Sequence, residues 1–164
     1  MAYRSHDRVQ AAQTSKLSVV IPSMGRVSLA TLINSLERHG ADWISEIIVV
    51  FDPAFLPDED TALQGSGVLP VSCVAAPGPG VNRARNHGAD LARSSLLAFL
   101  DDDVEVQSAD FFEEVFRLFE QPRVVAVGGG YDSFPGTDWL GRGYNALCSV
   151  WRASAGGGTS AARR

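Results

Sequence analysis

Five apolar residues, Leu96 to Leu100, run directly into three carboxylates, Asp101 to Asp103. A short apolar run bounded by polar residues is typical of a buried strand in a parallel sheet. In open α/β sheets, ligands bind beyond the carboxyl ends of the strands. The segment therefore predicts a buried strand whose acidic end is exposed and available to a ligand. The alternative is a solvated acidic turn without a ligand.

Further strands and helices alternate along the chain. Apolar and β-branched runs predict strands at Leu17 to Pro22, Glu46 to Phe51, Val71 to Ala75 and Arg123 to Val127. Helical spacing of apolar residues predicts helices from Val27 to a stop at Gly40, from Val81 to about Arg93, and from Ser108 to Pro122. This order predicts an α/β fold with a mostly parallel sheet flanked by helices.

The connection between Pro53 and Pro70 is rich in Pro, Asp, Glu, Gly and Ser. We expect it to lie on the surface, with a short helix around Glu59 to Gln64. The polar residues 1–15 are expected to form a flexible tail, and residues 16–164 a single domain. A chain of 164 residues, 45% of them hydrophobic, is long enough to bury one core.

The charge and the longest apolar runs exclude two classes of partner. The net charge is −5 and Lys16 is the only lysine, so no nucleic-acid partner is expected. No apolar run approaches the roughly 20 residues that span a bilayer, so no membrane span is expected. The two cysteines are far apart in the sequence, which argues against a zinc site and against a disulfide framework. Because reduced cysteines are typical of the cytosol, a cytoplasmic location is expected.

Asp101 and Asp103 have the spacing that suits a divalent metal ion. Alternate residues of an extended chain point to the same side, so both carboxylates can face one hard cation. Oxygen ligands of this type suit Mg²⁺ or Mn²⁺, which usually keep water molecules and substrate phosphates as further ligands. The sequence therefore predicts a Mn²⁺ or Mg²⁺ site at the end of this strand.

Arg83 and Arg85 occupy the start of a predicted helix, where the helix dipole disfavours cations. A bound anion would reverse this effect, because backbone N–H groups at a helix start and arginine side chains together suit a diphosphate. The alternative is that both side chains extend into solvent. A nucleotide-binding P-loop is excluded, because the only lysine precedes the first strand.

Four segments in order resemble the signatures of family 2 glycosyltransferases, which have the GT-A fold. The segments are residues 17–26, 46–52, 80–88 and 96–103, and the resemblance covers about residues 16–164. It implies metal-dependent transfer of a sugar, with inversion, from a nucleoside-diphosphate sugar to an acceptor hydroxyl. The acceptor is a saccharide, a lipid or a protein that the sequence does not identify.

The resemblance also implies roles for individual residues. Asp103 would be the chief metal-coordinating carboxylate, together with Asp101. The substrate-binding residues would be Pro22 and Ser23 at the border of the nucleotide pocket, Asp52 at the base, Arg85 beside the base and diphosphate, and Asp101 and Asp102 near the ribose and phosphates.

The sequence departs from the family pattern at three places. Asp52 is a single carboxylate followed by Pro53, where family members usually have two aspartates. Ser23-Met24-Gly25 replaces the more usual aromatic residue and asparagine. Family members also continue past the position of Arg164 into an acceptor region that carries the general base. We therefore expect this base beyond Arg164, with Asp132 and Asp138 as the last carboxylates within the chain.

Three alternatives to an active glycosyltransferase stay open on the sequence alone. The chain could be a catalytically incomplete nucleotide-sugar-binding module that is truncated or depends on a partner chain. It could also be a nucleotidyltransferase, which uses paired carboxylates on a similar sheet, or a purely structural domain. An incomplete acceptor side would expose apolar surface, which makes a homodimer a further expectation.

Overall fold

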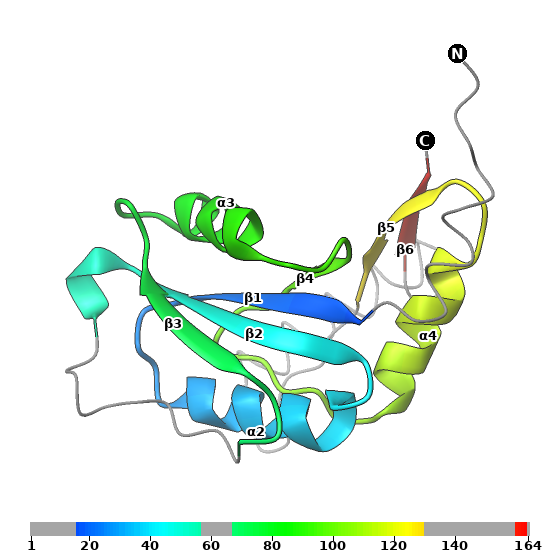
Figure 1. Ribbon diagram of the computed structural model, residues 1–164, viewed down its shortest axis with the longest axis horizontal. Helices are drawn as coiled ribbons and strands as arrows, with labels where there is room; N and C mark the ends of the chain where they lie inside the picture. The colour runs from blue at the N-terminus through cyan, green and yellow to red at the C-terminus, as the bar shows by residue number, and fades with distance from the viewer. Residues whose placement is uncertain (1–15, 57–66, 130–159, 164) are drawn as a thin grey trace, which may run out of the picture. The chain divides into compact units, whose positions relative to one another are not determined.

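The computed structural model describes residues 16–56 and 67–129 and the backbone of 160–163 (Figure 1). Contacts divide the chain into two compact units, Met1–Glu113 and Glu114–Arg164, which are described separately below. The expected tail, residues 1–15, and the short helix expected around Glu59 to Gln64 lie outside the described residues.

The first unit contains a sheet of four parallel strands in the order β3-β2-β1-β4. All four strands were predicted from the sequence, and their parallel pairing confirms the predicted α/β class. Every residue of β1 is buried, because strands flank it on both sides and helices cover both faces of the sheet. The strands are β1 Leu17–Ser23, β2 Ile44–Phe51, β3 Val71–Ala75 and β4 Leu97–Phe99.

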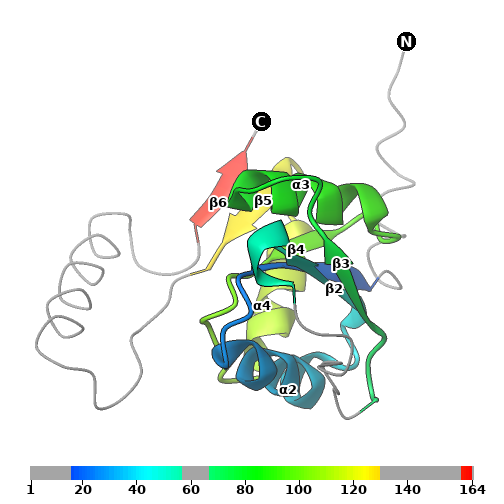
Figure 2. The same cartoon turned by 90° about the vertical axis from the view of Figure 1, so that its left-hand side faces the viewer.

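Helices α2 and α3 cover opposite faces of this sheet (Figures 1 and 2). Helix α2, Ser28–Gly40, buries an apolar stripe of Leu29, Leu32, Ile33 and Leu36. Helix α3, Val81–Leu91, begins after Gly80 and ends where Ala92 turns to extended backbone. Both predicted helices are confirmed, and α3 ends about two residues before the predicted end.

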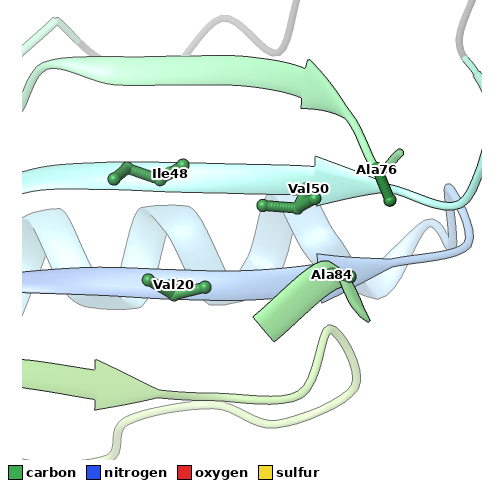
Figure 3. Close-up of a cluster of buried hydrophobic side chains, with 5 residues drawn as sticks. All are labelled: Val20, Ile48, Val50, Ala76 and Ala84. Atoms are coloured by element: carbon green, nitrogen blue, oxygen red, sulfur yellow. The ribbon is translucent and has the colours of Figure 1, made fainter. Parts of the chain in front are cut away.

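Small side chains bring α3 close to the sheet. Val20, Ile48, Val50, Ala76 and Ala84 form a buried cluster between the helix and the two central strands (Figure 3). Gly88 lies on the same side of α3. A Cβ atom at Gly88 would overlap a methyl group of Val20 and come within 3.1 Å of Val50 Cγ2. The close approach of α3 therefore depends on glycine at this position.

A buried carboxylate fixes the connection from α3 to β4. Glu46 accepts hydrogen bonds from Ser18 Oγ at 2.7 Å, from the backbone N–H of Arg93 at 2.9 Å and from Arg93 Nε at 2.9 Å. Burial raises the pKa of Glu46, but the hydrogen bonds from Arg93 and Ser18 outweigh it and lower the pKa below its ordinary value. The ionised Glu46 thus holds the chain that leads into β4.

The predicted strand at Leu96 to Leu100 is present, but the prediction that it is buried is wrong. Residues Leu97–Phe99 form β4, but Leu97 is 37% exposed and Phe99 is 46% exposed. Among the described residues β4 pairs only with β1, at the edge of the sheet, and has only three residues. An edge strand of this length has no second neighbour to cover its side chains, which the apolar composition could not reveal.

The second unit contains a separate pair of strands. Helix α4, Asp110–Phe119, spans the boundary between the units and follows the predicted segment, with the hydroxyl of Ser108 accepting from the Asp110 N–H. Strand β5, Val124–Gly128, confirms the predicted strand and pairs with β6, Ser160–Arg163, in antiparallel fashion.

None of the helices within the described segments is long and apolar enough to cross a lipid bilayer.

Replacing Gly88 by alanine tests the close contact between α3 and the sheet. Helix propensity alone would stabilise the variant by about 1 kcal/mol. The overlap with Val20 opposes this, and overpacking of a core typically costs about 1–3 kcal/mol. We expect a net loss in the free energy of unfolding, measured by urea denaturation. A gain in stability would show that α3 does not lie this close to β1.

Candidate functional site at the carboxyl edge of the sheet

The polar residues of the site follow the carboxyl ends of three parallel strands. Ser23 ends β1, Asp52 follows β2, and the acidic segment Asp101 to Asp103 follows β4. Because the strands are parallel, these ends meet at one edge of the sheet, where ligands of open α/β sheets bind. The start of α3 lies at the same edge, because the Gly80 N–H donates to Asp52 Oδ2 at 3.2 Å.

Asp102 is the buried centre of the site, with a side chain that is only 7% exposed. Its Oδ2 accepts from Ser23 Oγ at 2.7 Å and from the Met24 N–H at 3.1 Å. The hydroxyl of Ser23 also accepts from the Gly25 N–H at 2.9 Å. Asp102 therefore ties the loop after β1 to the loop after β4, and this is a positioning role.

Asp101 and Asp103 have the opposite character, because their side chains are 57% and 54% exposed. Asp101 Oδ1 accepts from Arg85 Nη2 at 2.6 Å, and Asp103 Oδ2 accepts from Arg26 Nη1 at 2.6 Å. The sequence prediction of an exposed acidic end is confirmed for these two residues. The middle carboxylate, which the prediction treated like the others, is the one that is buried.

Arg26 was not assigned a role from the sequence. It lies in the loop between β1 and α2, 77 residues away from its partner Asp103. Its position within the segment that resembles the first family signature was the available signal. No local pattern could show that a loop arginine reaches the acidic segment, because the contact depends on β1 lying next to β4.

Arg85 lies on α3 and donates a hydrogen bond to Asp101 in the acidic segment. Among the described hydrogen bonds, none joins Arg83 to that segment. The guanidinium of Arg83 instead lies over Gly78, where a Cβ atom would come within 2.5 Å of Nη1. The two arginines of the predicted anion site are thus separated. Arg85 is the one placed beside the carboxylates.

Asp52 organises the backbone around the start of α3. Its Oδ1 accepts from the Ala54 N–H at 3.0 Å and caps the short 3₁₀ helix η1, Pro53–Phe55. Its Oδ2 accepts from Gly80, whose φ of 108° is in a region that glycine tolerates best. The predicted contact of Asp52 with a nucleotide base stays a prediction, and each oxygen keeps a second lone pair for it.

Pro22 and Ser23 border the site less directly than the sequence suggested. Both are buried, and Pro22 pairs with Val50 within the sheet. Ser23 acts through Asp102, to which its hydroxyl donates. The exposed part of this border is formed by the next residues, Met24 to Arg26.

The donor set fits a hard divalent cation. Asp101 and Asp103 provide two exposed carboxylates, and Mg²⁺ and Mn²⁺ are commonly held by one or two carboxylates with phosphate and water. The segment forms a turn at Asp102 and Asp103, so the extended chain from which their common orientation was predicted is not present. Within the described segments there is no cluster of three or more His, Cys, Asp or Glu residues that could hold a metal. The further ligands of a cation bound here would be water molecules or substrate oxygens.

A four-stranded parallel sheet with helices on both faces and acidic residues at its carboxyl edge is the arrangement of nucleotide-binding GT-A domains. The sequence matches the model of glycosyl transferase family 2 over residues 18–160. The chain therefore belongs to glycosyl transferase family 2, which is an enzyme family. The resemblance inferred from the four sequence segments is confirmed.

Solved structures share this fold at low sequence identity. A mycobacterial protein matches with a TM-score of 0.58 and 17% identity over 99% of this chain. Glucosyl-3-phosphoglycerate synthase from Mycobacterium tuberculosis, in complex with uridine diphosphate (UDP), matches with a TM-score of 0.55 and 17% identity over 99% of this chain. The chain covers 58% and 62% of these two proteins.

A nucleotidyltransferase fold is also similar. The 4-diphosphocytidyl-2C-methyl-D-erythritol synthase from Anaerococcus prevotii matches with a TM-score of 0.54 and 14% identity, over 88% of this chain and 78% of that protein. At such identity the similarity shows the fold alone. No curated protein sequence matches the chain.

Two substitutions separate the positioning role of Asp102 from the exposed role of Asp101. Replacing Asp102 by asparagine puts an amide among groups that donate hydrogen bonds, and we expect it to cost about 1–3 kcal/mol of stability. Replacing Asp101 by asparagine should change stability by less than about 1 kcal/mol, because its ion pair is exposed. Urea denaturation of both variants measures the difference. Equal losses would contradict the assignment of Asp102 as the buried tie.

Proposed function

We propose that the carboxyl edge of the sheet binds a nucleoside-diphosphate sugar together with Mn²⁺ or Mg²⁺. The chain would thereby supply the donor-binding part of an inverting glycosyltransferase. One observation carries the proposal: two exposed carboxylates, each paired with an arginine, lie at the end of β4. Such a set of mixed charges suits a ligand that combines a diphosphate with a divalent cation.

The chain's own groups provide the anion-binding part of this site. The backbone N–H groups of the first turn of a helix have no acceptor within the helix and attract anions. In α3 this turn follows Gly80, which Asp52 holds in place. Arg85, one turn further along α3, adds a guanidinium that can form two parallel hydrogen bonds to a phosphate.

Asp101 and Asp103 are the residues that would hold the metal ion. A divalent cation bound to them would neutralise charge on the departing nucleoside diphosphate, which lowers the barrier to breaking the sugar–phosphate bond. Asp102 Oδ2 holds the loop after β1, so Asp102 fixes the backbone of the acidic segment between Asp101 and Asp103. Its predicted place near the ribose and phosphates stays a prediction.

Inversion requires a general base on the face of the sugar opposite the leaving group. In the proposed site Asp101 and Asp103 are used on the side of the metal ion and diphosphate, so the base would come from another residue. Asp132 and Asp138 lie outside the described residues. The chain covers about three fifths of two proteins that share its fold.

Two other functions remain to be separated from this one. A binding module without catalysis would bind the nucleotide sugar but release no nucleoside diphosphate. A nucleotidyltransferase usually has a glycine-rich, basic loop after the first strand, and here the loop after β1 contains one glycine and one arginine, Gly25 and Arg26. Family membership favours the glycosyltransferase over the nucleotidyltransferase.

Calorimetric titration with nucleoside diphosphates, beginning with UDP, tests the proposed site. We expect binding that strengthens at least tenfold when Mn²⁺ is added, because metal and phosphate share ligands. Asp101→Ala and Asp103→Ala should each remove most of this gain. Asp42→Ala changes an exposed carboxylate just before β2, at the opposite edge of the sheet, and serves as the matched control.

The proposal predicts that Asp42→Ala binds like the natural protein. The proposal is contradicted if none of the nucleoside diphosphates tested binds more tightly in the presence of Mn²⁺. It is equally contradicted if the two variants of the acidic segment retain the full effect of Mn²⁺.

A further inference from the structure

Arg26 occupies one of the two carboxylate oxygens that Asp103 could offer to a metal ion. Its Nη1 lies 2.6 Å from Asp103 Oδ2 and 3.4 Å from Asp102 Oδ1, so one guanidinium bridges both carboxylates. Asp102 is held by the Ser23 hydroxyl and the Met24 N–H and cannot follow a moving partner. Asp103 is exposed and has no such restraint in the described contacts.

A divalent cation and a guanidinium compete for this position. Both require the negative charge of Asp103, and two cations within a few ångström repel each other. A metal ion can therefore bind Asp103 fully only after Arg26 has moved away. The side chain of Arg26 is 51% exposed and lies on a loop, so its guanidinium can turn toward solvent.

An anion at the same edge would favour this movement. Once displaced, Arg26 is a free guanidinium next to the site, and a phosphate is the partner that its planar geometry suits. Ser23, Met24 and Asp102 keep the base of the loop in place, so Arg26 stays within reach of the edge. The same side chain can thus pair with Asp103 before binding and with the diphosphate after it.

We infer that Arg26 is a displaceable internal counter-ion that makes binding of the metal and of the nucleoside diphosphate depend on each other. In the free protein it neutralises Asp103 and weakens binding of metal alone. With the diphosphate present, the cation takes Asp103 and Arg26 takes the phosphate. This inference rests on the proposed nucleotide-sugar site and adds to it the order in which the charges are exchanged.

The inference predicts that Mn²⁺ and UDP strengthen each other's binding. If UDP raises the affinity for Mn²⁺ by some factor, Mn²⁺ raises the affinity for UDP by the same factor. Removing the charge of Arg26 should strengthen binding of Mn²⁺ alone, because the competitor is lost. It should weaken binding of UDP, because a phosphate partner is lost. Both changes reduce the coupling factor.

The test is a set of four dissociation constants for each variant of the whole chain. Mn²⁺ binding is measured by electron paramagnetic resonance of the free ion, with and without saturating UDP, and UDP binding by calorimetry, with and without Mn²⁺. The variants are Arg26→Gln and Arg26→Lys. Arg38→Gln is the matched control, since it removes the same charge from the last turn of α2, away from the acidic segment.

For Arg26→Gln we expect Mn²⁺ alone to bind about fivefold more tightly, the size expected for loss of one exposed ion pair. We expect UDP in the presence of Mn²⁺ to bind more weakly, and the coupling factor to fall. Arg26→Lys keeps the charge and should retain weak binding of Mn²⁺ alone. Arg38→Gln should behave like the natural protein.

Two results would overturn the inference. If Arg26→Gln and Arg38→Gln bind Mn²⁺ alone equally, while UDP binding stays metal-dependent, Arg26 does not compete with the metal and the proposed function survives. If neither UDP nor Mn²⁺ binds the natural protein or the variants, the proposed function fails together with the inference. Circular dichroism of each variant confirms that the compared proteins are folded.

Discussion

The carboxylate of Asp102 is the interaction on which the candidate site depends. It is buried, and it accepts hydrogen bonds from the Ser23 hydroxyl and the Met24 backbone, both in the segment that leaves β1. An ionised carboxylate is buried in a protein only when such donors compensate for the lost water. By meeting this requirement, the site joins the loop of β1 to the acidic segment after β4.

The sheet provides the frame for this tie. Strands β1 and β4 are adjacent and parallel, so their carboxyl ends lie together although about 80 residues separate them along the chain. Helix α3 lies close to β1 because Gly88 leaves room for Val20, and this places Arg85 beside Asp101. Glu46 holds the connection into β4 through Arg93 and Ser18. Packing on one face of the sheet thus positions charge at its edge.

Much of this arrangement follows from local sequence patterns. Runs of β-branched residues and helical spacing located the strands and helices of the described part of the first unit, because burial of one face imposes these periods. The acidic segment was located for the same reason, since three carboxylates after an apolar run mark a strand end. The ordered family signatures then predicted that Arg85 and Asp101 lie at one site, and the structure joins them in an ion pair.

The remaining features depend on contacts between distant segments. No local pattern distinguishes Asp102 from Asp101 and Asp103, because its burial is set by donors from the loop after β1. Arg26 was missed for the same reason. The exposure of β4 also escaped prediction, since an apolar strand at a sheet edge has the same composition as one in the centre. Asp102 is thus a buried structural residue within the exposed acidic segment.

We propose that metal and nucleoside diphosphate meet at the acidic segment. The most direct measurement is the loss of amide signals in nuclear magnetic resonance spectra of ¹⁵N-labelled protein when Mn²⁺ is added with UDP. We expect the signals of Asp101 to Val104 and of Met24 to Arg26 to broaden first, and more strongly with UDP than without it. Broadening centred on the opposite edge, around Ala41 to Trp43, or broadening that UDP does not change, would contradict it.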